Sequence, residues 1–286
     1  MPGSRRRPTI INSGIRAEMK VHGRGALPEV RAGRGDISLR TRYGAYRGGK
    51  SLPCWRDAFA GGLVMVDMIS ISELFNLEET IAAELFRDMA YPWEALPKIH
   101  DFIISLGSRL PKDVFEERGE HIWVAKSAKI APSACLNGPL IVDEEAEIRH
   151  CAFVRGNAIV GKGAVVGNST ELKNVVLFNK VQVPHYNYVG DSILGYKAHM
   201  GAGSVTSNVK SDKTLVVVKG RGFCVETGLK KMGAMLGDHV EVGCNSVLNP
   251  GTVIGRNTNI YPTSMVRGVV PSDSIYKNRT EIAAKR

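Results

Sequence analysis

The sequence has few of the features that mark secreted, membrane-spanning or metal-stapled proteins. Its five cysteines are scattered and none follows a CxxC spacing, so neither a disulfide framework nor a cysteine zinc site is expected. No apolar run is long enough to span a bilayer, and no charged segment leads into an apolar stretch near Met1. These absences predict a cytoplasmic chain with reduced thiols and no membrane partner.

Acidic residues are scarce at the start of the chain. Of the 38 Lys and Arg, thirteen lie in residues 1–64 with only four of the 28 Asp and Glu, so this segment carries +9 of the net charge of +10. It is rich in glycine and shows no periodicity, which predicts a dispensable, disordered basic leader. Alternatively, translation starts at Met65 or Met68. Without a motif or interleaved aromatics, the basic charge does not predict a nucleic-acid partner.

Helical patterns follow within residues 69–112. After Ser72, one apolar stripe at helical spacing predicts a helix that Pro92 ends; its members are Leu74, Leu77, Ile81, Leu85 and Met89. A second helix is predicted from 94 to 106, ending at Gly107. Because two short amphipathic helices do not fold well alone, we expect them to cap the first coil of the structure that follows, at Val124.

A six-residue repeat fills residues 120–270, before a C-terminal tail at 271–286. Apolar residues recur without a break at Val124, Ile130, Leu136, Val142, Ile148, Val154, Val160, Val166, Leu172 and Phe178. The register slips by one residue around 184–194 and resumes at Met200, then again from Leu236. Such a period predicts an all-β solenoid. Each unit supplies one short strand and a corner, and three units make an 18-residue coil that stacks on the next.

Four motifs in this repeat are specific. They read VRGNAIV from Val154, GNSTELKN from Gly167, PHYNYVGDSILG from Pro184 and GAGSVTSNVKSDK from Gly201. Together they resemble the hexapeptide-repeat acyltransferases. The nearest likeness is to the acetyltransferase half of the bifunctional enzyme that makes UDP-N-acetylglucosamine, and to stand-alone UDP-N-acetylglucosamine pyrophosphorylase-related proteins. The resemblance implies a left-handed parallel β-helix, a homotrimer and acetyl-CoA-dependent N-acetylation of glucosamine-1-phosphate or its galacto isomer.

The resemblance also implies roles for individual residues. His185 matches the general base of the family. The sugar-phosphate contacts match Arg155, Lys173, Tyr188, Asn208 and Lys213, and His199 replaces an asparagine that contacts the sugar. For the cofactor, Ala202 matches a position that binds CoA through the backbone. Cys244 and Pro262 replace a serine and an alanine of the CoA channel.

The residue chemistry agrees with these roles. Arg155 and Lys173 are one coil apart, so they should stack as two repelling cations that a bound phosphate would stabilise. Removing either should then preserve or raise stability; solvated charges, or pairing with Glu171, are the alternatives. His185 lies where the register slips, and histidine can accept a proton near neutral pH. Since Lys173 and His185 are expected on different faces, a shared site would lie between subunits.

Residues 207–236 interrupt the repeat with a hairpin pattern, Thr214–Lys219 and Phe223–Glu226 around a glycine turn. Either a flap over the CoA channel or a structural excursion would account for it.

The sequence leaves three other functions to compare with this one. A γ-class carbonic anhydrase on the same fold would need three zinc-binding histidines with a close pair, and His185 and His199 are fourteen residues apart. A non-catalytic or regulatory relative that binds a sugar nucleotide would fit the departures at His199, Cys244 and Pro262. A nucleotidyltransferase would need a glycine-rich nucleotide loop, which the sequence does not contain.

Overall fold

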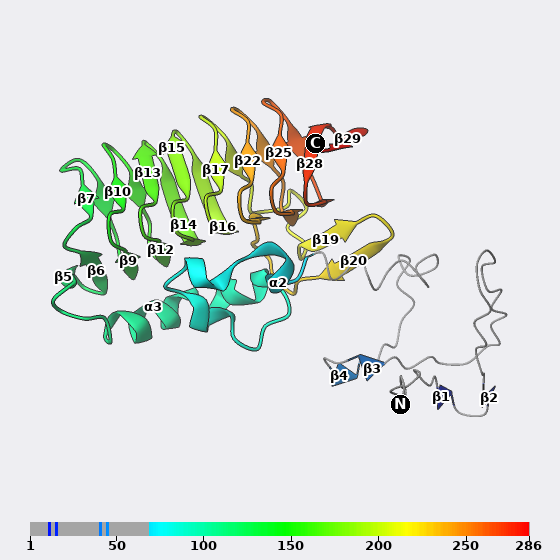
Figure 1. The fold of residues 1–286 in the computed structure, drawn as a ribbon, viewed down its shortest axis with the longest axis horizontal. Coiled ribbons are helices and arrows are strands. Elements are labelled where there is room, and N and C mark those ends of the chain that lie inside the picture. The colour runs from blue at the N-terminus through cyan, green and yellow to red at the C-terminus, as the bar shows by residue number, and fades with distance from the viewer. Residues whose placement is uncertain (1–10, 13–14, 17–39, 42–43, 46–68, 286) are drawn as a thin grey trace, which may run out of the picture. The chain divides into compact units, whose positions relative to one another are not determined.

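The computed structural model describes residues 69–285 and four two-residue strands that precede them in the chain (Figure 1). β1 (Ile11–Asn12) pairs with β2 (Ile15–Arg16), and β3 (Arg40–Thr41) pairs with β4 (Gly44–Ala45), both antiparallel. Apart from these strands, the leader predicted over 1–64 lies outside the described residues.

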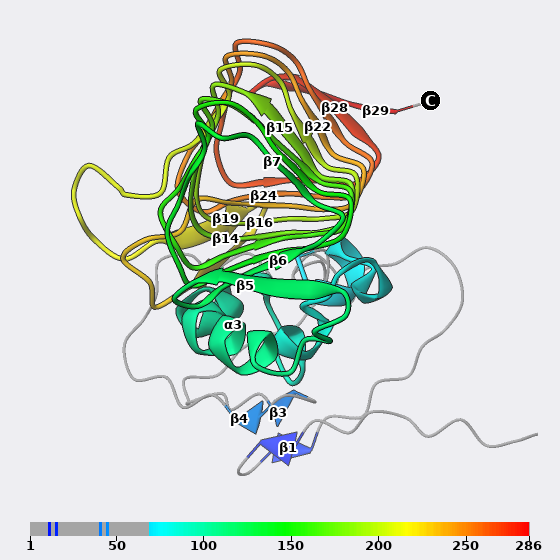
Figure 2. The same ribbon diagram turned by 90° about the vertical axis from the view of Figure 1, so that its left-hand side faces the viewer.

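The six-residue repeat forms a three-sided β-helix, as the sequence predicts. Figure 2 shows the triangular coils along their axis, winding left-handed as they recede from the viewer. Strands of successive coils pair in parallel: Ile148 lies between Ile130 of one coil and Val166 of the next. Ile148 and Val166 are buried in the prism, and alanines such as Ala146 and Ala164 fill the space beside them.

Each face of the prism is a ladder of short strands. The first face contains β7 (Lys129–Ile130), β10 (Glu147–Ile148), β13 (Val165–Asn168), β15 (Gln182–His185), β17 (His199–Met200), β22 (Glu241–Val242), β25 (Asn259–Ile260) and β28 (Ser274–Asn278). The second contains β8 (Cys135–Leu136), β11 (Phe153–Val154), the first halves of β14 (Glu171–Leu177) and β16 (Tyr188–Leu194), β18 (Val205–Thr206), β23 (Val247–Leu248) and β26 (Met265–Val266). The third contains β6 (Ile122–Ala125), β9 (Leu140–Val142), β12 (Ala158–Val160), the second halves of β14 and β16, β21 (Ala234–Leu236), β24 (Thr252–Ile254) and β27 (Val269–Val270).

The segment before the β-helix differs from the prediction of two helices. The first helix breaks into α2 (Ile71–Leu74) and the 3₁₀ turns η1 (Leu77–Glu79) and η2 (Ala83–Phe86). The second begins as the 3₁₀ helix η3 (Pro92–Lys98), which contains Pro97, and becomes helical only in α3 (Ile99–Gly107). Its predicted end at Gly107 is confirmed; a Cβ there would lie 2.2 Å from the Trp123 ring.

Tertiary contacts explain why the first helix is interrupted. Phe75 has an extended backbone, and its ring lies 5.0 Å from that of Phe178, beside Phe86. The next residue, Asn76, donates its backbone N–H to Asp238 of the β-helix at 2.7 Å. These contacts with the β-helix override the helical periodicity of the segment.

The helical segment covers a side of the prism and not its end, contrary to the prediction. In Figures 1 and 2 it lies along the third face, where α3 contacts β9, β12 and β14 and η3 contacts β16. The first coil is closed by β5 (Phe115–Gly119), which pairs antiparallel with β6. The strands of the third face are consequently buried on both sides, whereas the first two faces alternate buried and exposed residues.

The predicted C-terminal tail is part of the fold. β28 pairs with β25 and extends the first face, and β29 (Glu281–Ala284) folds back antiparallel onto β28. β29 therefore pairs with the free edge of β28 on the first face, as β5 pairs with the free edge of β6 on the third. Among the described residues no helix is long and apolar enough to cross a membrane.

Asp238 fastens the helical segment to the β-helix and provides a test of this packing. Its buried carboxylate accepts the backbone N–H groups of Asn76 at 2.7 Å and Tyr196 at 2.8 Å. Burial raises the pKa of the Asp238 carboxyl, so ionisation already costs some stability.

Replacing Asp238 with alanine should lower the free energy of unfolding by about 2 kcal/mol, because two part-buried backbone N–H groups lose their acceptor while one desolvated charge is removed. Thermal unfolding measures this loss. Asp273→Ala, at an exposed corner of the same edge, is the control and should change the melting temperature less. Equal melting temperatures for the two variants would contradict the role given to Asp238.

Candidate functional site

A polar cluster lies on the edge where the second face meets the third. Lys173 Nζ lies 2.8 Å and 3.0 Å from the two carboxylate oxygens of Asp191, whose side chain is only 4% exposed. The same carboxylate accepts the side-chain amides of Asn174 at 3.0 Å and Asn208 at 2.5 Å. Four residues from three successive coils therefore meet at one buried charge.

Shortened coils create this cluster. Val154 pairs with Leu172, one full 18-residue coil later. Ala158, in contrast, pairs with Val175, which is one residue short of a full coil. One residue is therefore missing at Lys173–Asn174, and β14 and β16 each run through the corner as one seven-residue strand. The slip predicted near His185 thus begins earlier. As a consequence, Leu177 rather than Phe178 lies above Val160 in the prism.

Phe178 is displaced outward by the same slip. It packs against Phe75 and Phe86 of the helical segment, with ring centroids 5.0 Å and 5.8 Å away. The tenth residue of the apolar series therefore belongs to the contact with that segment.

The two predicted phosphate-binding cations are not bare. Arg155 lies one coil from Lys173, as expected, but its guanidinium pairs with Glu171 at 2.9 Å, and Lys173 pairs with Asp191. The prediction of two repelling cations is wrong, because each has its own carboxylate. The two pairs differ in setting: about half of the Arg155 side chain is exposed, whereas the Asp191 side chain is buried.

Tyr188 and Asn208 complete this edge. The Asn208 amide donates to the Tyr188 hydroxyl at 3.2 Å as well as to Asp191. Burial raises the pKa of Tyr188, and the nearby Asp191 carboxylate adds to this effect, so the phenol stays protonated. The structure thus brings together four of the predicted contacts, Arg155, Lys173, Tyr188 and Asn208, on one edge.

His185 lies on a different edge, where the first face meets the second. It is exposed at the end of β15, and its carbonyl accepts the N–H of Gly203. In the same way, the Ala202 carbonyl accepts the N–H of Asn245, and the Cys244 carbonyl accepts the N–H of Thr263. His185 therefore stands in one column with the three predicted cofactor residues, Ala202, Cys244 and Pro262.

The remaining two predicted contacts lie elsewhere. His199 is on β17 of the first face, and its Nδ1 lies 2.8 Å from a Glu241 carboxylate oxygen. Lys213 is exposed in the predicted 207–236 insertion, in a turn where its N–H donates to the Lys210 carbonyl. The described contacts of this single chain do not bring either residue to the cluster around Asp191.

The hairpin predicted in the insertion is confirmed as β19 (Val217–Gly220) and β20 (Phe223–Glu226). It packs beside β24 and β27, with Val216 and Val218 buried, and the Val217 and Lys219 backbones pass close to Gly251 and Gly268. These glycines lie where the second face meets the third, on the edge of the Asp191 cluster and not on the edge of the Ala202 column. Within one chain the hairpin is therefore a structural excursion and not a flap over that column.

Asp191 is the functional candidate that sequence reasoning missed. An aspartate in a glycine-containing turn resembles many other corner residues, so composition gives no signal. The loss of one residue from the repeat spacing is the one signal that could have pointed to this corner.

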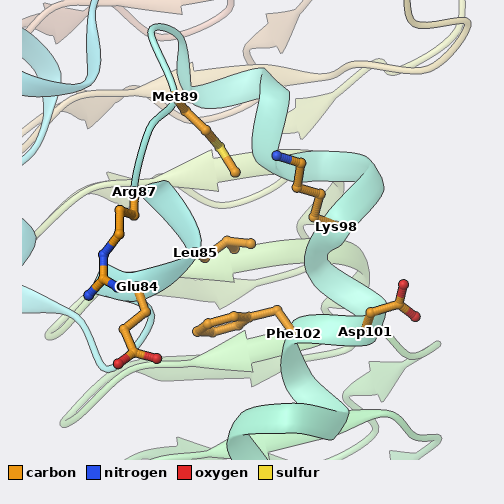
Figure 3. A pocket seen from close by; sticks show the side chains of 7 residues that line it. All are labelled: Glu84, Leu85, Arg87, Met89, Lys98, Asp101 and Phe102. Atoms are coloured by element: carbon orange, nitrogen blue, oxygen red, sulfur yellow. The ribbon is translucent and has the colours of Figure 1, made fainter.

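A hollow among the described residues lies away from the predicted site residues. This hollow, of about 480 Å³, is an open depression in the helical segment, where η2 and the turn after it face α3 (Figure 3). It is lined by Glu84, Leu85, Arg87, Met89, Lys98, Asp101 and Phe102. Among the described residues, no group of three His, Cys, Asp or Glu side chains could hold a metal ion.

Because the two ion pairs are buried to different extents, their removal should affect stability differently, unlike the prediction from sequence. Lys173→Met should lower the free energy of unfolding by about 3 kcal/mol, because it leaves the buried Asp191 charge without its cation. Arg155→Ala breaks only an exposed pair and should leave the melting temperature close to that of the wild type. Thermal unfolding at neutral pH compares them. If both variants melted together with the wild type, Asp191 would not be a buried charge in solution.

Known proteins resemble this chain along the β-helix. Residues 136–242 match the family described as the GMPPB C-terminal domain. A bifunctional protein GlmU of Methanococcus maripaludis is 31% identical over 220 residues, covering 70% of this chain and 49% of that protein. A bifunctional sugar-1-phosphate nucleotidylyltransferase/acetyltransferase of Sulfurisphaera tokodaii is 28% identical over 246 residues, covering 74% and 57%. The chain spans about half the length of the curated relatives it matches.

Among solved structures, the acetyltransferase domain of PglB from Neisseria gonorrhoeae is 12% identical with a TM-score of 0.27, covering 56% of each chain. That similarity is too low to bear on function. The sequence relatives confirm the resemblance predicted from the four motifs. Through its β-helix the chain is related to the GMPPB C-terminal domain and to the bifunctional GlmU proteins, and it resembles the hexapeptide-repeat acyltransferases.

Proposed function

We propose that this chain is an acetyltransferase that moves an acetyl group from acetyl-CoA to the amine of an amino-sugar 1-phosphate, glucosamine-1-phosphate or its galacto isomer. The observation that carries the proposal is the edge formed by Arg155, Lys173, Tyr188 and Asn208. It gathers the donors that a sugar phosphate requires. A relative named as a sugar-1-phosphate nucleotidylyltransferase/acetyltransferase, similar over 74% of this chain, supports the substrate class.

Arg155 is the phosphate-binding residue in this proposal. A guanidinium binds phosphate through two parallel hydrogen bonds, and an exposed ion pair contributes little to stability. A phosphate can therefore displace Glu171 from Arg155 at small cost. Lys173 and the Tyr188 hydroxyl supply further donors beside it.

His185 acts as the general base. It takes a proton from the substrate ammonium, and the resulting amine attacks the thioester carbonyl of acetyl-CoA. The tetrahedral intermediate then collapses to the amide as the C–S bond breaks, and the proton lost from its nitrogen is taken up by the leaving CoA thiolate. His185 is exposed and stands in the column of Ala202, Cys244 and Pro262, which supports placing the donor along that edge.

The substrate edge and the base edge belong to one site only if two copies of the chain meet. In a single chain, the second face separates His185 from Lys173, and His199 lies on the first face. The third face is covered by the helical segment and the hairpin, so the first two faces are the ones open to other subunits. We infer a homotrimer in which each site is shared between neighbouring chains. Its free thiols at Cys135, Cys151 and Cys244 suit a reducing cytoplasm.

The role of His185 is tested by its alanine variant. His185→Ala should lower kcat about 10²–10⁴-fold, the usual contribution of a general base. Its melting temperature should not change, because the side chain is exposed. Thiol release from acetyl-CoA, with glucosamine-1-phosphate and its galacto isomer in parallel, measures the rate. Exposed Tyr186→Phe is the control. Normal turnover by His185→Ala would exclude this mechanism and favour a relative that binds a sugar nucleotide without converting it.

The shared site predicts the assembly. Light scattering on the full chain should give about three times the protomer mass. Mixing His185→Ala with Lys173→Met, after dissociation and reassembly, should give more activity at low sugar-phosphate concentration than either variant alone, since some mixed sites receive both intact residues. A monomer that acetylates the sugar would contradict the shared site.

A further inference from the structure

We propose that Asp191 is a positioning residue of this site, one that fixes the Lys173 ammonium and the Asn208 amide and thereby decides which of their atoms face the sugar phosphate. This inference rests on the proposed function for its consequence on catalysis. Its structural half, the fixing of Lys173, can be measured without any substrate.

The contacts of Asp191 leave its side chain little freedom. Both carboxylate oxygens receive Lys173, one also receives Asn174 and the other Asn208. Its backbone is held as well, because the carbonyl accepts the N–H of Gly233 at 2.8 Å. A carboxylate buried with four donor contacts acts as a fixed anchor for the groups that donate to it.

The corner itself is built around this anchor. Asp191 has a left-handed backbone (φ 46°), which Asp and Asn tolerate better than most residues. Gly190 leaves room for the Tyr188 phenol, since a Cβ there would lie 2.5 Å from the hydroxyl oxygen. Both residues belong to the shortened coils, and at this corner the Asp191 carboxylate is buried while Tyr188 is half-buried.

The neighbours of Asp191 keep specific donors and acceptors for a ligand. The Asn208 amide has two N–H hydrogens, and both are used, on Asp191 and on Tyr188. Its carbonyl oxygen remains as an acceptor for a sugar hydroxyl. Tyr188 accepts from Asn208 and so keeps its own hydrogen to donate. Lys173 has three N–H hydrogens, of which the carboxylate oxygens take two.

Asp191 also gives Lys173 and Arg155 different electrostatic roles. Asp191 balances the charge of Lys173, so Lys173 presents a directed N–H rather than an unpaired cation. Net attraction for a phosphate then comes from Arg155 once Glu171 is displaced. Without Asp191, Lys173 would gain rotamer freedom and Asn208 could turn its amide, so the edge would no longer match the sugar.

Asp191→Asn is the variant of choice, because asparagine keeps the size and suits the left-handed backbone. It removes the charge and places an amide among donors. Glu144→Gln is the matched control: Glu144 pairs with Lys162 at 3.4 Å on a more exposed part of the same β-helix.

Trace labelling of lysines with acetic anhydride, mapped by mass spectrometry, tests the anchor on the full chain. Asp191→Asn should speed the labelling of Lys173 severalfold relative to wild type, because the amine loses its carboxylate. Glu144→Gln should leave Lys173 unchanged. An unchanged rate at Lys173 in Asp191→Asn would overturn the proposal, whatever the activity.

Kinetics test the consequence for the substrate. KM for glucosamine-1-phosphate should rise about tenfold or more in Asp191→Asn, while KM for acetyl-CoA and kcat stay within about twofold. A purely structural role would instead change both KM values or kcat together, and would overturn the positioning role.

If Asp191→Asn does not fold, the Asp191→Asn, Lys173→Met double variant replaces it. Because Asp191 also fixes Asn208, that variant should raise KM for the sugar phosphate above that of Lys173→Met, and an equal KM would contradict the proposal. Inactivity of the wild type toward both sugar phosphates would remove the proposed function alone, and the labelling result would then decide the role of Asp191.

Discussion

Parallel backbone pairing between successive coils is the constraint on which the rest of this structure depends. Each strand is fixed by the coil before it and the coil after it, as Ile148 is by Ile130 and Val166. The position of each inward side chain along the axis of the prism is then fixed. Outward side chains that are one coil apart form straight columns. Residues far apart in the chain thus become neighbours at coil spacing, which is how the column of His185, Ala202, Cys244 and Pro262 arises.

A change of one residue in this pairing has large local effects. When the coil shortens at Lys173–Asn174, an apolar ring leaves the prism and a carboxylate enters its edge. Phe178 becomes the anchor for the helical segment, and Asp191 becomes the anchor for Lys173 and Asn208. The same irregularity therefore organises the packing of the third face and the chemistry of the neighbouring edge.

The two ion pairs on that edge illustrate how burial separates structure from binding. Lys173 and Asp191 are held together by the cost of leaving a buried charge unpaired, so their contact belongs to the framework. Arg155 and Glu171 are more exposed, and solvent screens their attraction, so in the proposed function a phosphate displaces Glu171 at small cost. Two cations at equivalent positions of the repeat thus have different roles. A bound phosphate would compete with Glu171 for Arg155, and not with Asp191 for Lys173.

The sequence alone determined the β-helix, most of its inward residues, the hairpin in the insertion and the end of α3, because the six-residue period and the glycine turns are local properties of the chain. It also identified the motifs that match the relatives of the β-helix. It did not determine the broken first helix, the side of the prism that the helical segment covers, or the carboxylate that each cation takes. Those were decided by the tertiary structure, through contacts such as that between Asn76 and Asp238, 162 residues apart. A periodic pattern specifies which residues face inward, but only the packed coils decide which outward groups come within hydrogen-bonding distance and how far water is excluded from them.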